Sequence, residues 1–175
     1  HYLHRRHVDA EALGALVIRQ RENALANPRA LMRGGLTMAD YLASPSIATP
    51  LRKLDCCLET DGACALVVVD ARRAPRSTSQ PVYVRACVRG GGPGMSAVDK
   101  AGQNISTIFS AYVAPLLYRA ARIGPDAIDL LQLYDAYSPL ILQQMEDFGF
   151  VKAGDVADYA RHGGGRPVNT NGGLL

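Results

Sequence analysis

DLLQLYDAYS, residues Asp129–Ser138, joins a short apolar run to a polar cluster. With the preceding isoleucine, the run predicts a short buried strand over 128–133. Tyr134 and Asp135 follow directly at the carboxyl end of that strand. In open α/β sheets, ligands bind at the carboxyl ends of strands, so we expect a functional site here.

Helices are predicted after and before this stretch. Pro139–Phe148 is expected to be a helix that Gly149 ends. Ile105–Ala121 is expected to be a longer helix, in which Pro115 predicts a kink or an early end.

Two more helices are expected near the amino terminus. Asp9 is a suitable N-cap for a helix that runs to about Ala26, with apolar side chains on one face. Thr37 and Asp40 form a pattern like a capping box, which predicts a short helix through about Leu42.

Apolar runs in the middle of the chain predict strands. Ala63–Val69 is almost continuously apolar, which is typical of a strand covered on both faces. Val82–Val88 alternates well enough for another strand, and 74–81 is expected to be a loop. Strands that alternate with helices predict an α/β domain with layers around a mixed or parallel sheet.

Composition limits the class of protein. The chain has 175 residues, a net charge of +3 and 48% hydrophobic residues, which suits one globular domain or parts of two. It contains no apolar run near the roughly 20 residues that a membrane span requires. It starts at His1 and stops soon after a Gly-Gly pair, so we expect a piece of a longer chain.

The cysteines indicate the redox environment of the protein, and the charges indicate which type of ligand it binds. Cys64 and Cys87 lie in the apolar runs, and no CxxC spacing exists, so we expect reduced buried thiols, no metal and a cytoplasmic location. Residues 61–125 hold eight Lys/Arg and three acids, which suits a phosphate-bearing ligand. This stretch lacks interleaved aromatic residues, so nucleic acid is not an expected partner.

Several short motifs, in this order, resemble the thiolase superfamily and within it the sterol-carrier-protein type, also called nonspecific lipid-transfer-protein thiolases. The motifs are Asn27–Ala30 (NPRA), Thr37–Leu42 (TMADYL), Pro50–Arg52 (PLR), Asp61–Ala65 (DGACA), Glu146–Phe150 (EDFGF) and Pro167–Gly173 (PVNTNGG). The resemblance implies an α/β thiolase-like layered fold (α-β-α-β-α), only part of which lies in this chain. It implies a loop and helical region over 1–60, the last strand of the amino-terminal half and a linker over 61–80, and a truncated carboxyl-terminal half-domain over 81–175.

Tyr134 departs from the usual pattern, because thiolases place Asn, or His in the sterol-carrier type, at this position. A tyrosine here resembles the thiolase-like aldolases of bacterial steroid side-chain degradation. That resemblance implies retro-aldol cleavage of a β-hydroxyacyl-CoA thioester with Tyr134 as the catalytic residue. The implied substrate-binding residues are Tyr137, Asn169, Asn171, Gly172 and Gly173.

The resemblance also implies partners and leaves alternatives open. It implies a coenzyme A thioester as substrate with no cofactor, a homodimer, and a small OB-fold partner that binds acyl-CoA. The nucleophilic cysteine and the Gly-His-Pro histidine of thiolases would lie outside this chain, so an acyl-CoA C-acyltransferase stays possible, as does a non-catalytic acyl-CoA- or lipid-binding subunit.

Tyr134 could be a packing residue with a satisfied hydroxyl and Tyr137 a pocket wall, while we expect Asp135 to cap the helix near Pro139.

Overall fold

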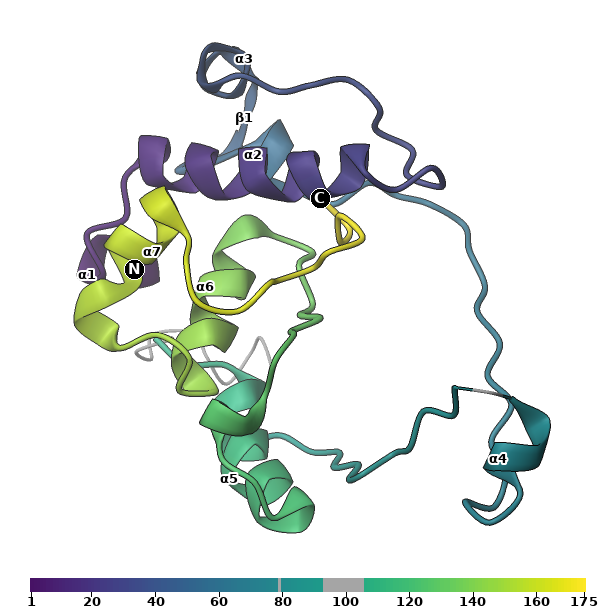
Figure 1. Cartoon of the computed structure of the whole chain (residues 1–175). Coiled ribbons are helices and arrows are strands. Elements are labelled where there is room, and N and C mark those ends of the chain that lie inside the picture. The colour runs from purple at the N-terminus through teal and green to yellow at the C-terminus, as the bar shows by residue number, and fades with distance from the viewer. Residues whose placement is uncertain (79, 93–105) are drawn as a thin grey trace.

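The structure is a computed structural model that describes residues 1–78, 80–92 and 106–175. Its centre is α2 (Ala10–Leu25), which lies across α6 (Ser138–Asp147) and α7 (Val156–His162), with α3 (Met38–Ala43) on its other side (Figure 1). The remaining elements are α1 (Tyr2–Arg5), β1 (Ser46–Ala48), β2 (Leu51–Arg52), η1 (Lys53–Asp55), α4 (Ala74–Ser77), α5 (Phe109–Ala121), η2 (Pro125–Ala127) and η3 (Ala153–Asp155).

The predicted amino-terminal helix is confirmed as α2. The Asp9 side chain caps it by accepting a hydrogen bond from the Ala12 amide at 2.8 Å. Leu13 and Leu16 are each only 1% exposed. Full burial of such a side chain is worth about 1.5–3 kcal/mol, so this apolar face anchors the core.

The short helix α3 begins with the predicted capping box. The Thr37 side chain accepts from the Asp40 amide, and the Asp40 side chain accepts from the Thr37 amide. Gly14 of α2 allows α3 to approach closely, because a Cβ at Gly14 would lie 2.6 Å from the ring of Tyr41.

α5 and α6 are both helices, as the sequence predicted. α6 ends at Asp147, and Gly149 lies just past its C-cap residue with a φ of +79°, which favours glycine. α5 starts at Phe109, while the predicted first residue, Ile105, lies outside the described residues. An early end at Pro115 is wrong, since the helix continues to Ala121.

The predicted strands in the middle of the chain are wrong for this structure. Among the described residues, the one sheet is the antiparallel pair β1–β2. The runs 63–69 and 82–88 are extended but unpaired, and they lie in an arm that leads away from the helices to α4 (Figure 1). Val67 and Val82 are 92% and 94% exposed.

The physical reason is that a strand needs a neighbouring backbone to pair with its N–H and C=O groups. No such neighbour lies beside the arm in the part of the chain that the structure describes. Cys64 and Cys87 are therefore exposed free thiols instead of buried ones. The strand predicted over 128–133 is reduced to one parallel bridge between Leu131 and Val168.

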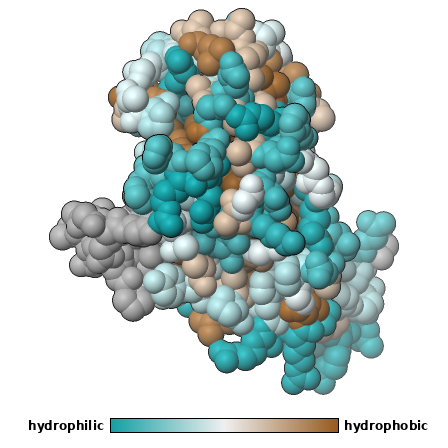
Figure 2. Space-filling view, turned by 90° about the vertical axis from the view of Figure 1, so that its left-hand side faces the viewer, coloured by the Kyte–Doolittle hydropathy of each residue, from teal (hydrophilic) through white to brown (hydrophobic). Residues whose placement is uncertain are grey.

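The surface is uneven in hydropathy. In Figure 2 hydrophilic side chains cover much of the middle of one face, and apolar side chains gather at its upper end. That end carries α3 and β1, where Leu42 and Ile47 are 37% and 63% exposed. None of the helices within the described ranges is both long and apolar enough to cross a membrane.

Candidate active site

The segment that precedes Tyr134 is held by the side chain of Asn169. The Leu133 amide donates to Asn169 Oδ1 at 2.7 Å, and Asn169 Nδ2 donates to the Leu133 carbonyl at 3.1 Å. Asn169 is only 1% exposed. Its amide is therefore used to hold the backbone, although the sequence suggested it as a substrate-binding residue.

Tyr134 and Tyr137 present their rings to solvent. They are 56% and 48% exposed. The structure gives the Tyr134 hydroxyl no hydrogen-bond partner among the residues that it describes. The Tyr134 phenol is therefore exposed among the described residues, and the choice between a catalytic and a packing tyrosine stays a prediction.

Asp135 does not cap α6, so that prediction is wrong. Both of its carboxylate oxygens accept from the Leu174 amide at 3.0 Å, and Leu174 lies 39 positions further along the chain. Asp135 is 1% exposed, and burial raises its pKa against the opposing effect of these hydrogen bonds. The residue thus joins the tyrosine segment to the end of the chain.

The shifted pKa of Asp135 predicts how stability depends on pH. The folded state holds this proton more tightly than the unfolded chain, whose aspartate pKa is about 3.9. Relative to Asp135→Asn, the wild type should be most stable below that value and should lose stability as the pH rises through the raised folded pKa. Urea unfolding of both full-length proteins across this pH range measures the difference. A difference that stays constant, or that favours the wild type more at higher pH, would contradict the assignment.

The turn after Asn169 requires two glycines. Gly172 has a φ of +102°, and a Cβ there would lie 2.5 Å from Ala24 Cβ of α2. Gly173 has a φ of +69°, and a Cβ there would lie 1.9 Å from Asp135 Oδ2. The Asn171 side chain accepts from the Gly173 amide at 3.2 Å. Positive φ and close approach both exclude larger residues.

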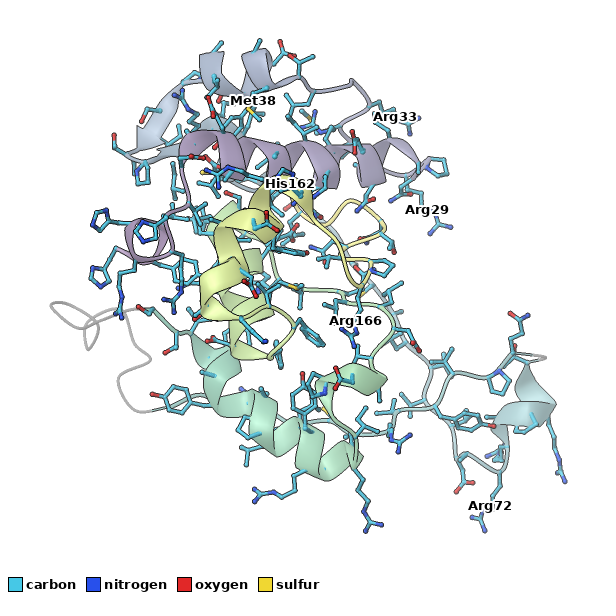
Figure 3. All side chains as sticks on the ribbon, turned by 60° about the vertical axis from the view of Figure 1, so that its left-hand side comes forward. Arg29, Arg33, Met38, Arg72, His162 and Arg166 are labelled. Atoms are coloured by element: carbon cyan, nitrogen blue, oxygen red, sulfur yellow. The ribbon has the colours of Figure 1, made fainter. Side chains whose placement is uncertain are left out.

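A hollow of about 200 Å³ lies beside this turn. Asn171, Gly172 and Gly173 line it together with the loop after α2, which contributes Arg29. Arg29 and Arg33 extend from this loop at the end of α2 (Figure 3). The structure therefore gathers three of the predicted substrate-binding residues, whereas Tyr134, Tyr137 and Asn169 do not line this hollow.

A buried carboxylate, Asp55, joins α3 to the first residue of α6, which directly follows Tyr137. Asp55 is fully buried and accepts from the Tyr41 hydroxyl at 3.0 Å to each oxygen and from Ser138 Oγ at 2.6 Å. Burial and the Asp55 charge raise the pKa of Tyr41. Next to it, the Cys57 amide donates to the Ala136 carbonyl at 2.9 Å. Asp55 carries no motif, so only the tertiary structure identifies it.

Comparison with known protein families matches the carboxyl-terminal part of the chain. The family model for a thiolase C-terminal domain-like unit matches residues 95–175.

Similar curated proteins match almost the whole chain. A 17-hydroxy-3-oxo-4-pregnene-20-carboxyl-CoA lyase of Mycobacterium tuberculosis is 35% identical over 99% of this chain and 47% of its own. A steroid side-chain-cleaving aldolase of Thermomonospora curvata is 33% identical over 99% and 46%. An acetyl-CoA acetyltransferase of Methanothermobacter thermautotrophicus is 33% identical over 94% and 44%. The chain therefore spans about half the length of the curated relatives that it matches.

A solved structure has the same arrangement of the backbone. It is described as an Ltp2-ChsH2(DUF35) aldolase, and it matches with a TM-score of 0.91 and 33% sequence identity. The match covers 99% of this chain and 48% of that one.

Proposed function

Since this chain belongs to the thiolase superfamily and has part of the thiolase-like fold, we propose that it serves an enzyme that cleaves a β-hydroxyacyl-CoA by a retro-aldol reaction. The observation that carries the proposal is Tyr134, an exposed tyrosine with a free hydroxyl on a backbone held from both sides. The names of two relatives, a steroid-type carboxyl-CoA lyase and a steroid side-chain-cleaving aldolase, support a steroid side chain as the acyl group.

The reaction requires few groups. A base removes the proton of the β-hydroxyl, the Cα–Cβ bond breaks, and its electron pair moves onto the thioester as an enolate. The β-carbon leaves as a ketone, and the enolate takes up a proton to give a shorter acyl thioester. Tyr134 is the proposed relay for the β-hydroxyl proton: its phenol oxygen accepts that proton while its own hydroxyl proton passes to solvent, which supplies the proton that the enolate takes up. The cleavage is redox-neutral overall, so the proposed reaction requires no redox cofactor.

Paired assays test this proposal. The full-length protein is given a β-hydroxyacyl-CoA, with ketone release as the readout, and separately a β-ketoacyl-CoA with free coenzyme A, with thiolysis as the readout. We expect ketone release and little thiolysis. Robust thiolysis without ketone release would instead identify an acyltransferase.

The acyltransferase is the second candidate because a specific observation favours it. A relative that is 33% identical is named an acetyl-CoA acetyltransferase. That reaction uses a cysteine nucleophile, and the four cysteines of this chain include none beside a histidine in sequence. A third possibility, an acyl-CoA- or lipid-binding subunit, would bind the thioester without turning over either substrate.

Coenzyme A is proposed to lie along the hollow at Asn171, Gly172 and Gly173, with its phosphates near Arg29. By contrast, Arg72 lies on the arm, apart from α2 (Figure 3), and is paired with Asp70 at 3.0 Å. The predicted basic stretch also includes Lys100, which lies outside the described residues.

Replacing Arg29 with glutamine should weaken this contact. An exposed charge contact is worth under about 1 kcal/mol, so we expect KM for the thioester to rise by about threefold at low salt. The effect should shrink at high salt, because salt screens exposed charges. Arg72→Gln is the control and should keep the wild-type KM. Equal KM values for Arg29→Gln and wild type at low salt would remove Arg29 from the site.

Partners and location complete the proposal. We propose a partner protein, supported by the two components, Ltp2 and ChsH2, that are named for the similar solved structure. A homodimer, and an OB fold and acyl-CoA binding for that partner, are proposed from the resemblance alone. The exposed apolar side chains of β1 and of the arm are suited to burial against partner surfaces. The four free cysteines support a reducing, cytoplasmic location.

A further inference from the structure

Gln144 differs from the other buried polar side chains because it serves the backbone of Tyr134. It lies on α6 and is only 3% exposed. Its Oε1 accepts from the Tyr134 amide at 3.3 Å, and its Nε2 donates to the Tyr134 carbonyl at 2.5 Å. Nε2 also donates to the Leu140 carbonyl at 2.9 Å, which fixes the side chain to its own helix.

Two side-chain amides therefore hold two consecutive residues. Asn169 satisfies both backbone groups of Leu133, and Gln144 satisfies both backbone groups of Tyr134. In a sheet, a neighbouring strand would make these contacts. Here two separate elements replace it, and fully satisfied buried amides of this kind make the local backbone rigid.

This arrangement separates the two parts of Tyr134. Its backbone is fixed by Gln144 of α6 and the preceding residue by Asn169, while its ring is more than half exposed and its hydroxyl has no hydrogen-bond partner among the described residues. A group that transfers a proton must meet its target within hydrogen-bond distance, and a displacement of about 1 Å can reduce the rate by about 100-fold.

We propose that Gln144 is a positioning residue, which acts through the backbone of Tyr134 to direct the phenol at the substrate's β-hydroxyl. This inference rests on the proposed function. Gln144 touches neither the substrate nor the reacting atoms; it affects the reaction only through the placement of Tyr134.

The first test compares two Gln→Met variants of the full-length protein. Methionine has a volume close to that of glutamine but makes neither hydrogen bond. We expect Gln144→Met to lower kcat for ketone release by about 10- to 100-fold, with KM changed by less than about threefold. Gln20→Met is the matched control, because Gln20 is also 3% exposed but its Oε1 has no hydrogen-bond partner among the described residues. It should keep the wild-type kcat.

The second test separates positioning from general stability. In a Tyr134→Phe background, Gln144→Met should cause no further loss of kcat, because the group that it positions is gone. Losses that multiply would overturn the proposal, and so would a wild-type kcat in Gln144→Met. If Gln144→Met does not fold, Gln144→Glu is measured instead, since it keeps the acceptor for the Tyr134 amide and removes the donor to the carbonyl. A lower kcat with unchanged KM supports the proposal, and a wild-type kcat overturns it.

These outcomes are distinct from failure of the proposed function. Full ketone release by Tyr134→Phe would remove the catalytic role of Tyr134 itself. A large loss in Tyr134→Phe together with full activity in Gln144→Met would reject only the positioning role.

Discussion

Replacing Tyr134 with phenylalanine should lower kcat for ketone release by about 100- to 10,000-fold, the usual contribution of general acid–base catalysis. The ring is kept and only the free hydroxyl is lost, so the fold and substrate binding should change little. Steady-state kinetics with a β-hydroxyacyl-CoA measure both parameters, and the reduction should appear in kcat with KM nearly constant.

Tyr137→Phe is the matched control for this prediction. Tyr137 is exposed to a similar extent, 48% against 56%, and stands three residues further along the same stretch. If Tyr137 only forms part of a pocket wall, Tyr137→Phe should lower kcat for ketone release much less than Tyr134→Phe does. Full activity of Tyr134→Phe, or a larger loss in Tyr137→Phe, would show that the proton acceptor is assigned to the wrong residue.

Gly173→Ala should produce the largest loss of stability of any single methyl group added to the site. A Cβ at Gly173 would lie 1.9 Å from Asp135 Oδ2 and 3.0 Å from Asn169 Nδ2, and the φ of +69° adds strain for alanine. The turn must move and break the contact between Asp135 and Leu174. We expect a loss of about 3–5 kcal/mol in unfolding free energy, measured by urea unfolding of the full-length protein.

Gly154→Ala provides the control for added volume. A Cβ at Gly154 would meet no atom within 4 Å, so this variant should stay within about 0.5 kcal/mol of the wild type. Equal stability of the Gly173→Ala and wild-type proteins would mean that the turn does not close against Asp135 in solution.

Local signals explain which parts of the fold the sequence predicts well. Asp9 and Thr37 make their predicted cap contacts within three residues along the chain, and Gly149 ends α6 by its own backbone preference. The resemblance to the thiolase superfamily and the thiolase-like fold are confirmed by the comparisons. Ala63–Val69 has equally clear strand character, but a strand forms only where another backbone pairs with it.

The site shows the same division. That the functional site lies at the end of the 128–133 run stays a prediction from residue types, and Gly172 and Gly173 are named through the resemblance to the thiolase superfamily. The contacts of Asp135, Asn169 and Gln144 could not, because each joins residues that are 10 to 39 positions apart. A sequence pattern records which side chains are polar, and only the packed structure determines which backbone group each one meets.

The most direct test of the central claim is a balance of products with the wild-type full-length protein. The substrate is a β-hydroxyacyl-CoA, and free coenzyme A, total thioester and ketone are all measured during turnover. Retro-aldol cleavage predicts one ketone for each shorter acyl thioester formed, with total thioester constant and no free coenzyme A consumed. No ketone from the β-hydroxyacyl-CoA, while a β-ketoacyl-CoA given to the same protein consumes one free coenzyme A and yields a second thioester for each cleavage, would contradict the account.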